Sequence, residues 1–134
     1  EPGRPTDYAS LGFERLQVLV VEDNLINQKV IRAMLKQFGI DADVCGNGLE
    51  AVNTVSENRD RYDLILMDCE MPEMDGFTAT EHIRKLVAVG RPTIAALTAH
   101  ALPENRELSR RSGMDHYLTK PIRLDELHRL LLCV

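Results

Sequence analysis

The chain has 134 residues, of which 44% are hydrophobic and 28% are charged, and its formal net charge is -5. This size fits one globular domain with a single core and leaves no room for separate catalytic and regulatory domains. The apolar content excludes a disordered chain, the hydrophobic runs are too short to span a bilayer, and the acidic balance disfavours direct binding of nucleic acid.

The cysteines indicate the redox environment of the protein, and the first residue bears on whether the chain is part of a longer polypeptide. The three cysteines, Cys45, Cys69 and Cys133, are scattered and show no C-x-x-C spacing, which argues against a disulfide framework and a zinc site. We therefore expect a reducing, cytoplasmic environment and no membrane contact by this domain. The chain starts with Glu1 and carries no signal peptide, so we expect a piece of a longer polypeptide.

The N-terminal part is predicted to be a tail followed by a strand and a helix. Residues 1–14 carry prolines and glycines among polar neighbours, with no strand or helix periodicity, and are expected to form a linker or tail before a domain at 15–134. The run at 16–21 is almost wholly apolar, which predicts a central strand buried on both faces. An amphipathic helix follows it and stops at Gly39.

Four further strand and helix pairs follow along the chain. A half-polar edge strand at 41–45 precedes a helix near 47–58, and an apolar strand at 62–67 runs straight into Asp68. The remaining expected elements are a helix after Gly76, a strand at 93–97, a helix from Pro103, a strand at 116–119 and a last helix from about 123. Five such pairs predict a doubly wound α/β fold, in which ligands bind beyond the carboxyl ends of the strands.

Polar residues stand at four of these strand ends. They are Glu22 and Asp23 after the first strand, Asp68 after the third, Thr98 after the fourth and Lys120 after the fifth. Single polar residues often mark a chain reaching the surface, but five at one edge favour a site. Clustered carboxylates repel one another unless a cation lies among them, and oxygen ligands of this kind suit Mg2+, with Mn2+ as the alternative. Together with a lysine and a hydroxyl, these groups are typical of phosphoryl transfer with Asp68 as nucleophile.

The segments around these residues resemble the receiver domain of two-component response regulators. The resemblance rests on Glu22-Asp23-Asn24, MDCEMPEMDG around Asp68, LTAHA around Thr98, and the Lys120-Pro121 pair, and it covers about 15–134. It implies a flavodoxin-like, five-stranded parallel sheet in the order 2-1-3-4-5, with five helices.

The resemblance also assigns roles to individual residues. It implies Asp68 as phosphoacceptor, Glu22 and Asp23 as metal-binding acids, the backbone carbonyl of Glu70 as a further metal ligand, and Thr98 and Lys120 as phosphoryl contacts. Tyr117 falls at the aromatic switch position of the family, although an aromatic residue in such a strand is as readily part of a core. Phosphorylation is expected to draw Thr98 inward, admit the Tyr117 ring and change the surface of the fourth helix, fifth strand and fifth helix.

Two residues beside the expected site, Glu70 and His100, are candidates for setting the lifetime of the acyl phosphate. Each lies two positions after a site residue, so its side chain could orient or obstruct an attacking water. The alternative interpretation is that both are variable loop residues.

The start of the first helix, Asn24-x-x-Asn27, together with the MDCEMPEMDG block, resembles receivers of hybrid histidine kinases. This implies a histidine kinase phosphodonor domain and a histidine phosphotransfer domain docking near Ile26. The parent would be a sensor kinase, of a class that includes membrane-anchored proteins. The domain itself would catalyse its own phosphorylation and dephosphorylation. The receiver of a stand-alone response regulator, or a scaffold that works without phosphorylation, stays open as an alternative.

Two other classes of protein share parts of this pattern. Residues 46–51 fit the dinucleotide-binding pattern G-x-G-x-x-A, but that pattern belongs after a buried central strand, whereas 41–45 is half polar. Phosphatases with an aspartyl nucleophile resemble D-x-D-x-T at the end of the first strand, where this chain has Glu22-Asp23-Asn24. Both readings are therefore disfavoured.

Overall fold

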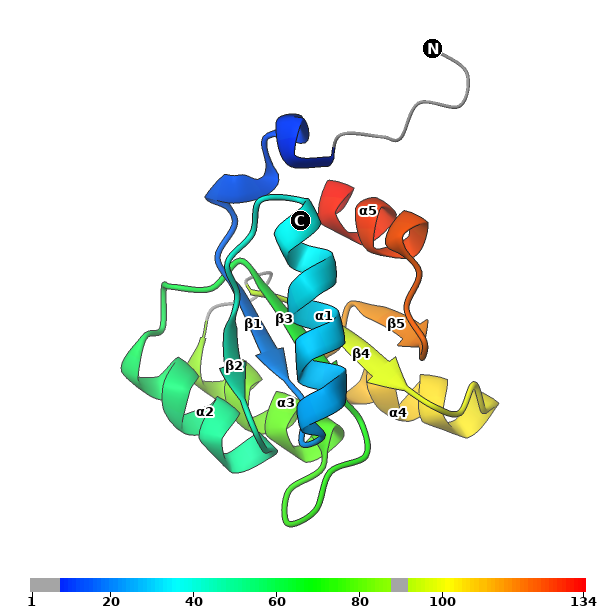
Figure 1. Cartoon of the computed structure of the whole chain (residues 1–134). Helices are drawn as coiled ribbons and strands as arrows, with labels where there is room; N and C mark the ends of the chain where they lie inside the picture. The colour runs from blue at the N-terminus through cyan, green and yellow to red at the C-terminus, as the bar shows by residue number, and fades with distance from the viewer. Residues whose placement is uncertain (1–7, 88–91) are drawn as a thin grey trace.

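The computed structural model describes residues 8–87 and 92–134. Its five parallel strands lie in the order β2-β1-β3-β4-β5, which confirms the predicted topology (Figure 1). The strands are β1 (Val18–Val21), β2 (Asp43–Cys45), β3 (Leu64–Asp68), β4 (Thr93–Thr98) and β5 (His116–Thr119). The helices are α1 (Leu25–Gln37), α2 (Gly48–Glu57), α3 (Gly76–Leu86), α4 (Pro103–Ser112) and α5 (Leu124–Leu132).

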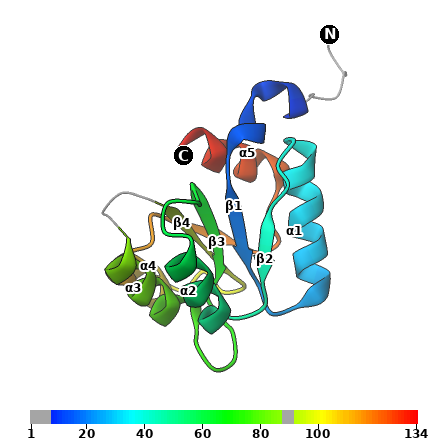
Figure 2. The same cartoon turned by 90° about the vertical axis from the view of Figure 1, so that its left-hand side faces the viewer.

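Helices cover both faces of the sheet, so that the core has two halves. Figure 2 shows α1 and α5 on one side and α2, α3 and α4 on the other. Alternate residues of the central strands supply the two halves, since Val20 packs with the α1 and α5 side and Leu19 with the α2 and α3 side. Every residue of β1 and of β3 is buried, as expected for central strands of a parallel sheet. Within the described residues, no helix is long and apolar enough to cross a membrane.

Side-chain caps fix the helix starts that follow the strands. The Asn24 side chain accepts hydrogen bonds from the backbone at Ile26 and Asn27 and begins α1, and the Asp75 side chain caps α3 in the same way. Pro103 stands at the first turn of α4, where its missing N–H costs nothing. The loop between β1 and α1 is therefore short and fixed, and it holds the residues that follow β1.

The N-terminal segment differs from the expected tail. Residues Tyr8–Leu11 and Phe13–Arg15 form two short 3-10 helices, called η1 and η2, and Phe13 is 6% exposed within the core. The Tyr8 ring centroid lies 4.6 Å from that of Phe38 at the end of α1. Packing therefore begins well before residue 15. Helical turns of three or four residues are too short to show a period in the sequence, and residues 1–7 lie outside the described part of the chain.

Candidate functional site

The carboxyl ends of neighbouring strands bring the predicted site residues together. β1 pairs with β3 and β3 pairs with β4, with Val21 opposite Met67 and Asp68 opposite Leu97. The residue after β1 and the last residues of β3 and β4 therefore meet at one edge of the sheet. β1 lies between β2 and β3, and the chain leaves β1 and β3 toward opposite faces of the sheet (Figure 2). In folds of this type, ligands usually bind at the edge where neighbouring strands diverge in this way.

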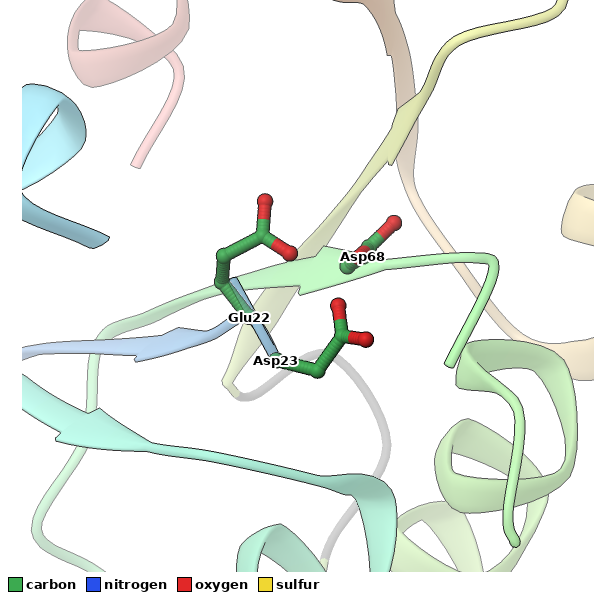
Figure 3. A group of neighbouring side chains, drawn as sticks. All are labelled: Glu22, Asp23 and Asp68. Carbon is green, nitrogen blue, oxygen red and sulfur yellow. The ribbon is translucent and has the colours of Figure 1, made fainter. Parts of the chain in front are cut away.

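Three carboxylates form the centre of the site. Glu22, Asp23 and Asp68 each offer an oxygen atom, and these atoms lie within 4.8 Å of one another (Figure 3). Glu22 and Asp68 are buried at 0% and 2% exposure, whereas Asp23 is exposed. A hard dication that keeps part of its water shell fits this donor set, because all the ligands are oxygens and one side is open to solvent.

Lys120 supplies the positive charge beside the buried acids. Its Nζ lies 2.7 Å from Glu22 Oε1 and 3.2 Å from Asp68 Oδ1. The backbone N–H of Lys120 donates to the carbonyl of Thr98 at 2.7 Å, which ties the end of β5 to the end of β4. The lysine that follows β5 is therefore held beside the acids at the ends of β1 and β3. This position leaves Asp23 as the most exposed of the three acids.

The pKa values of the two buried acids shift in opposite directions, although burial alone would raise both. Burial raises the pKa of Asp68, the neighbouring Glu22 adds to this rise, and Lys120 opposes it. Burial also disfavours ionisation of Glu22, but hydrogen bonds with Asp68 and Lys120 outweigh it and hold the pKa of Glu22 well below its usual value. Glu22 therefore carries the negative charge that faces Lys120, and Asp68 is the member of the pair that binds a proton more readily.

A second group of contacts surrounds the hydroxyl of Thr98, which is buried at 0% exposure. Thr98 Oγ1 donates to Glu70 Oε1 at 2.8 Å and accepts from the backbone N–H of His100 at 3.1 Å. The backbone N–H of Glu70 in turn donates to Asp68 Oδ1 at 3.2 Å. Glu70 thus contacts the central acid through its backbone and the threonine through its side chain.

Tyr117 lies next to this group and is half-buried. Its hydroxyl donates to the carbonyl of His100 at 2.7 Å, and the guanidinium of Arg106 on α4 stands 5.0 Å from the ring centroid. The structure therefore brings Tyr117 to the loop that follows Thr98, while the His100 residue itself is exposed. The contact with Arg106 was not anticipated, because an arginine in a polar helix carries no local signal of an aromatic partner.

The glycine pattern at 46–51 has a packing explanation. A Cβ built on Gly48 would lie 2.6 Å from the carbonyl of Met74 and 3.2 Å from the Ala79 side chain. Glycine at this position allows α2 to pack against the loop before α3. β2 is an edge strand, and its end lies beside β1 alone, so the pattern does not follow a central strand as the dinucleotide-binding motif does.

The family model described as "Response regulator receiver domain" matches residues 18–132. Among curated relatives, hybrid signal transduction histidine kinase B of Dictyostelium discoideum is 41% identical over 131 residues, which cover 89% of this chain and 7% of that protein. The chain thus spans a small part of this relative.

Solved structures with the same fold are similar over most of the chain. The receiver domain of sensor histidine kinase PA1611 from Pseudomonas aeruginosa, which has a magnesium ion in its active site cleft, is 44% identical. Its TM-score is 0.79, and the match covers 88% of this chain and 95% of that one. The receiver domain of Ssk1 from Saccharomyces cerevisiae, solved with the histidine phosphotransfer protein Ypd1, is 32% identical with a TM-score of 0.78 and covers 89% of this chain and 88% of that chain.

Proposed function

Since the chain belongs to the response regulator receiver domain family, we propose that it accepts a phosphoryl group from a phosphohistidine on Asp68. The observation that carries this proposal is the cluster of Glu22, Asp23 and Asp68 with Lys120 in contact with two of the acids. A buried carboxylate with a cationic side chain 3.2 Å away is a suitable acceptor, because the charge of the incoming group is offset where it arrives.

The metal proposed for this site is Mg2+, with Mn2+ as the alternative. The carboxylates of Glu22, Asp23 and Asp68, with the backbone carbonyl of Glu70, would hold it, and it would supply positive charge against the carboxylates and phosphoryl oxygens. The all-oxygen donor set and the open side at Asp23 support this assignment.

The proposed transfer is a single displacement at phosphorus. An oxygen of ionised Asp68 forms a bond to phosphorus while the bond from phosphorus to the donor imidazole nitrogen breaks, and the electron pair of that bond stays on the imidazole. Lys120 stabilises the negative phosphoryl oxygens from its place beside Asp68. The Thr98 hydroxyl can donate a hydrogen bond to one of these oxygens.

Phosphorylation is proposed to switch a surface on the far side of Thr98. When its hydroxyl turns to the phosphoryl group, the contacts that now connect it with His100 and Tyr117 have to rearrange. Tyr117 lies on β5 and is covered by Arg106 of α4, so the change reaches the surface formed by α4, β5 and α5. A bias of a few kcal/mol between two arrangements suffices for such a switch.

The proposed onward partner is a histidine phosphotransfer domain that docks on α1. Leu25, Ile26 and Val30 are exposed apolar residues on the first turns of this helix, with Ile26 at 72% exposure. A groove of about 310 Å3 runs from Val30 to Lys120 and Glu22, so a partner on α1 would reach the carboxylate cluster. The complex of the yeast receiver with a phosphotransfer protein supports this kind of partner.

The proposed parent is a hybrid histidine kinase, which would provide the phosphodonor domain and carry this domain on the cytoplasmic side. The match to part of the Dictyostelium hybrid kinase supports it. Within such a parent, Glu70 and His100 remain candidates for setting the lifetime of the acyl phosphate. The decay of the phosphorylated protein, compared between wild type and the Glu70→Ala and His100→Ala variants, tests this, and unchanged decay would exclude both.

The proposed function is tested by incubating the protein with acetyl phosphate and Mg2+ and measuring its intact mass. We expect the wild type to gain one phosphoryl group and the Asp68→Asn variant to gain none. Unchanged mass of the wild type, or equal labelling of the variant, would contradict the proposal and favour a scaffold that works without phosphorylation. Continuous hydrolysis of small phosphate esters would instead favour a phosphatase.

A further inference from the structure

The hydroxyl of Thr98 is already engaged by a charged acceptor. A threonine hydroxyl has one hydrogen to donate, and Thr98 donates it to Glu70 Oε1 at 2.8 Å. The backbone N–H of His100 donates to Thr98 Oγ1 at 3.1 Å, so the threonine oxygen is an acceptor as well as a donor. The carbonyl of His100 lies 3.2 Å from Thr98 Oγ1 and is the more distant acceptor, and Thr98 is fully buried, so solvent offers none. The threonine therefore cannot donate to a phosphoryl oxygen while it is bonded to Glu70.

The hydrogen bond to Glu70 competes with the contact that the proposed switch requires. An ionised carboxylate is a stronger acceptor than a neutral group, so the bond from Thr98 is charge-assisted. The new hydrogen bond from Thr98 to the phosphoryl group must offset the free energy lost when the bond to Glu70 breaks. The backbone of Glu70 also lies beside the phosphoryl site, since its N–H donates to Asp68 Oδ1 at 3.2 Å.

The competing bond is the first link of a continuous chain of contacts. Thr98 donates to Glu70, the His100 N–H donates to Thr98, and the Tyr117 hydroxyl donates to the His100 carbonyl. These contacts connect the carboxylate of Glu70 with Tyr117 without involving Asp68. The sequence places Glu70 and Thr98 28 residues apart, and the fold brings them into contact.

We propose that the Glu70 carboxylate is a positioning residue that holds the Thr98 hydroxyl in the unphosphorylated arrangement and so opposes the switch. This inference rests on the proposed function of Asp68 and adds the regulation of that site. It predicts that removing the carboxylate makes the phosphorylated arrangement easier to reach, even though Glu70 lies beside the reacting group. Glu70 acts through Thr98 and does not itself take part in the transfer.

The first test measures the affinity of beryllofluoride, a mimic of the phosphoryl group, in saturating Mg2+. We expect the Glu70→Ala variant to bind it about three- to tenfold more tightly than the wild type, the range that corresponds to removing one competing hydrogen bond. The Glu70→Gln variant keeps an acceptor without the charge and should fall between them. The Glu73→Gln variant is the control, because it removes one negative charge from the same loop. Glu73 is exposed and, among the described residues, makes no hydrogen bond to Thr98. It should match the wild type.

A double-mutant cycle separates positioning from simple charge repulsion. In a Thr98→Ala background the Glu70→Ala change should have no effect on beryllofluoride affinity, because the hydroxyl that Glu70 holds is gone. The amide resonance of His100 offers a second readout. In the Glu70→Ala variant without ligand, it should move toward its position in the beryllofluoride-bound wild type.

Each possible failure has a distinct signature. If the wild type binds beryllofluoride and the Glu70→Ala variant binds it no more tightly, the positioning role is wrong while the proposed function stands. The positioning role is also wrong if the effect of Glu70→Ala persists without the Thr98 hydroxyl, or if Glu73→Gln reproduces it. If the wild type does not bind beryllofluoride with Mg2+, or if Asp68→Asn binds it equally well, the proposed function itself fails.

Discussion

Replacing Asp68 by asparagine should stabilise the protein in the absence of metal, although it removes the proposed phosphoacceptor. Asp68 is 2% exposed. Burial raises the pKa of its carboxyl from 3.8 to about 7, with Glu22 adding to the rise and Lys120 opposing it. An acid whose pKa is higher in the folded protein than in the unfolded chain binds more protons when folded. The stability of the wild type therefore falls as the pH rises from about 4 to about 7, and asparagine escapes this loss.

The size of this effect follows from the change in pKa. At about 1.4 kcal/mol for each tenfold change in the ionisation constant, the rise from 3.8 to about 7 corresponds to about 4 kcal/mol of unfolding free energy when the carboxyl is ionised. The contact between Asp68 and Lys120 is already counted in this pKa, because Lys120 opposes the rise. We expect a gain of about 4 kcal/mol at pH 8 and about 2 kcal/mol at pH 5, because the wild type loses about 1.4 kcal/mol for each pH unit between the unfolded and the folded pKa.

The measurement is urea unfolding in EDTA, followed by circular dichroism at pH 5 and pH 8. The Asp41→Asn variant is a matched control, since Asp41 is exposed and is not part of the acidic cluster; it lies just before the edge strand β2. The control should unfold like the wild type at both pH values. A gain for Asp68→Asn of equal size at both pH values, or a loss at pH 8, would refute the reasoning.

Three further predictions concern the metal, the cysteines and the N-terminal segment. Mg2+ affinity should rise with pH up to about 7. The pKa of Asp68 is raised, so its carboxyl is protonated below that pH and must lose the proton before it binds a cation. Calorimetric titration at several pH values measures this, and an affinity that does not change with pH would contradict it. A thiol reagent should modify Cys133 alone in the native protein and all three cysteines in urea, since the other two are buried; fast native labelling of more than one would contradict the structure. The Phe13→Ala variant should lose about 3 kcal/mol in chemical unfolding, whereas a loss below about 0.5 kcal/mol would show that this segment is a tail after all.

The helices and strands were largely predictable because their hydrophobic periods are long. The amphipathic helix that ends before Gly39 and the apolar run into Asp68 both lie where the sequence places them. The site was predictable for a related reason, since parallel strands bring their carboxyl ends to one edge, and polar residues after buried strands need partners there. The strand order came from the family resemblance, because periodicity alone does not say which strands are neighbours.

Contacts between distant loops could not be predicted in the same way. The sequence marks Glu70 as a residue near the site but does not show that its carboxylate contacts Thr98, because the loops after β3 and β4 determine that meeting. The packing of Phe13 and Tyr8 was missed because short helical turns leave no period, and their partner rings lie on α1 and α5. In both cases the decisive partner is remote in the chain and becomes adjacent only through the fold.

The central claim is that Asp68 itself forms the acyl phosphate. The most direct measurement is to phosphorylate the protein with acetyl phosphate and Mg2+, reduce it with borohydride, and locate the product by peptide mass spectrometry. Borohydride converts an aspartyl phosphate to homoserine, so we predict homoserine at position 68 and an unmodified aspartate at position 23. Recovery of unreduced aspartate at position 68 from labelled protein, or homoserine at another position, would contradict the claim.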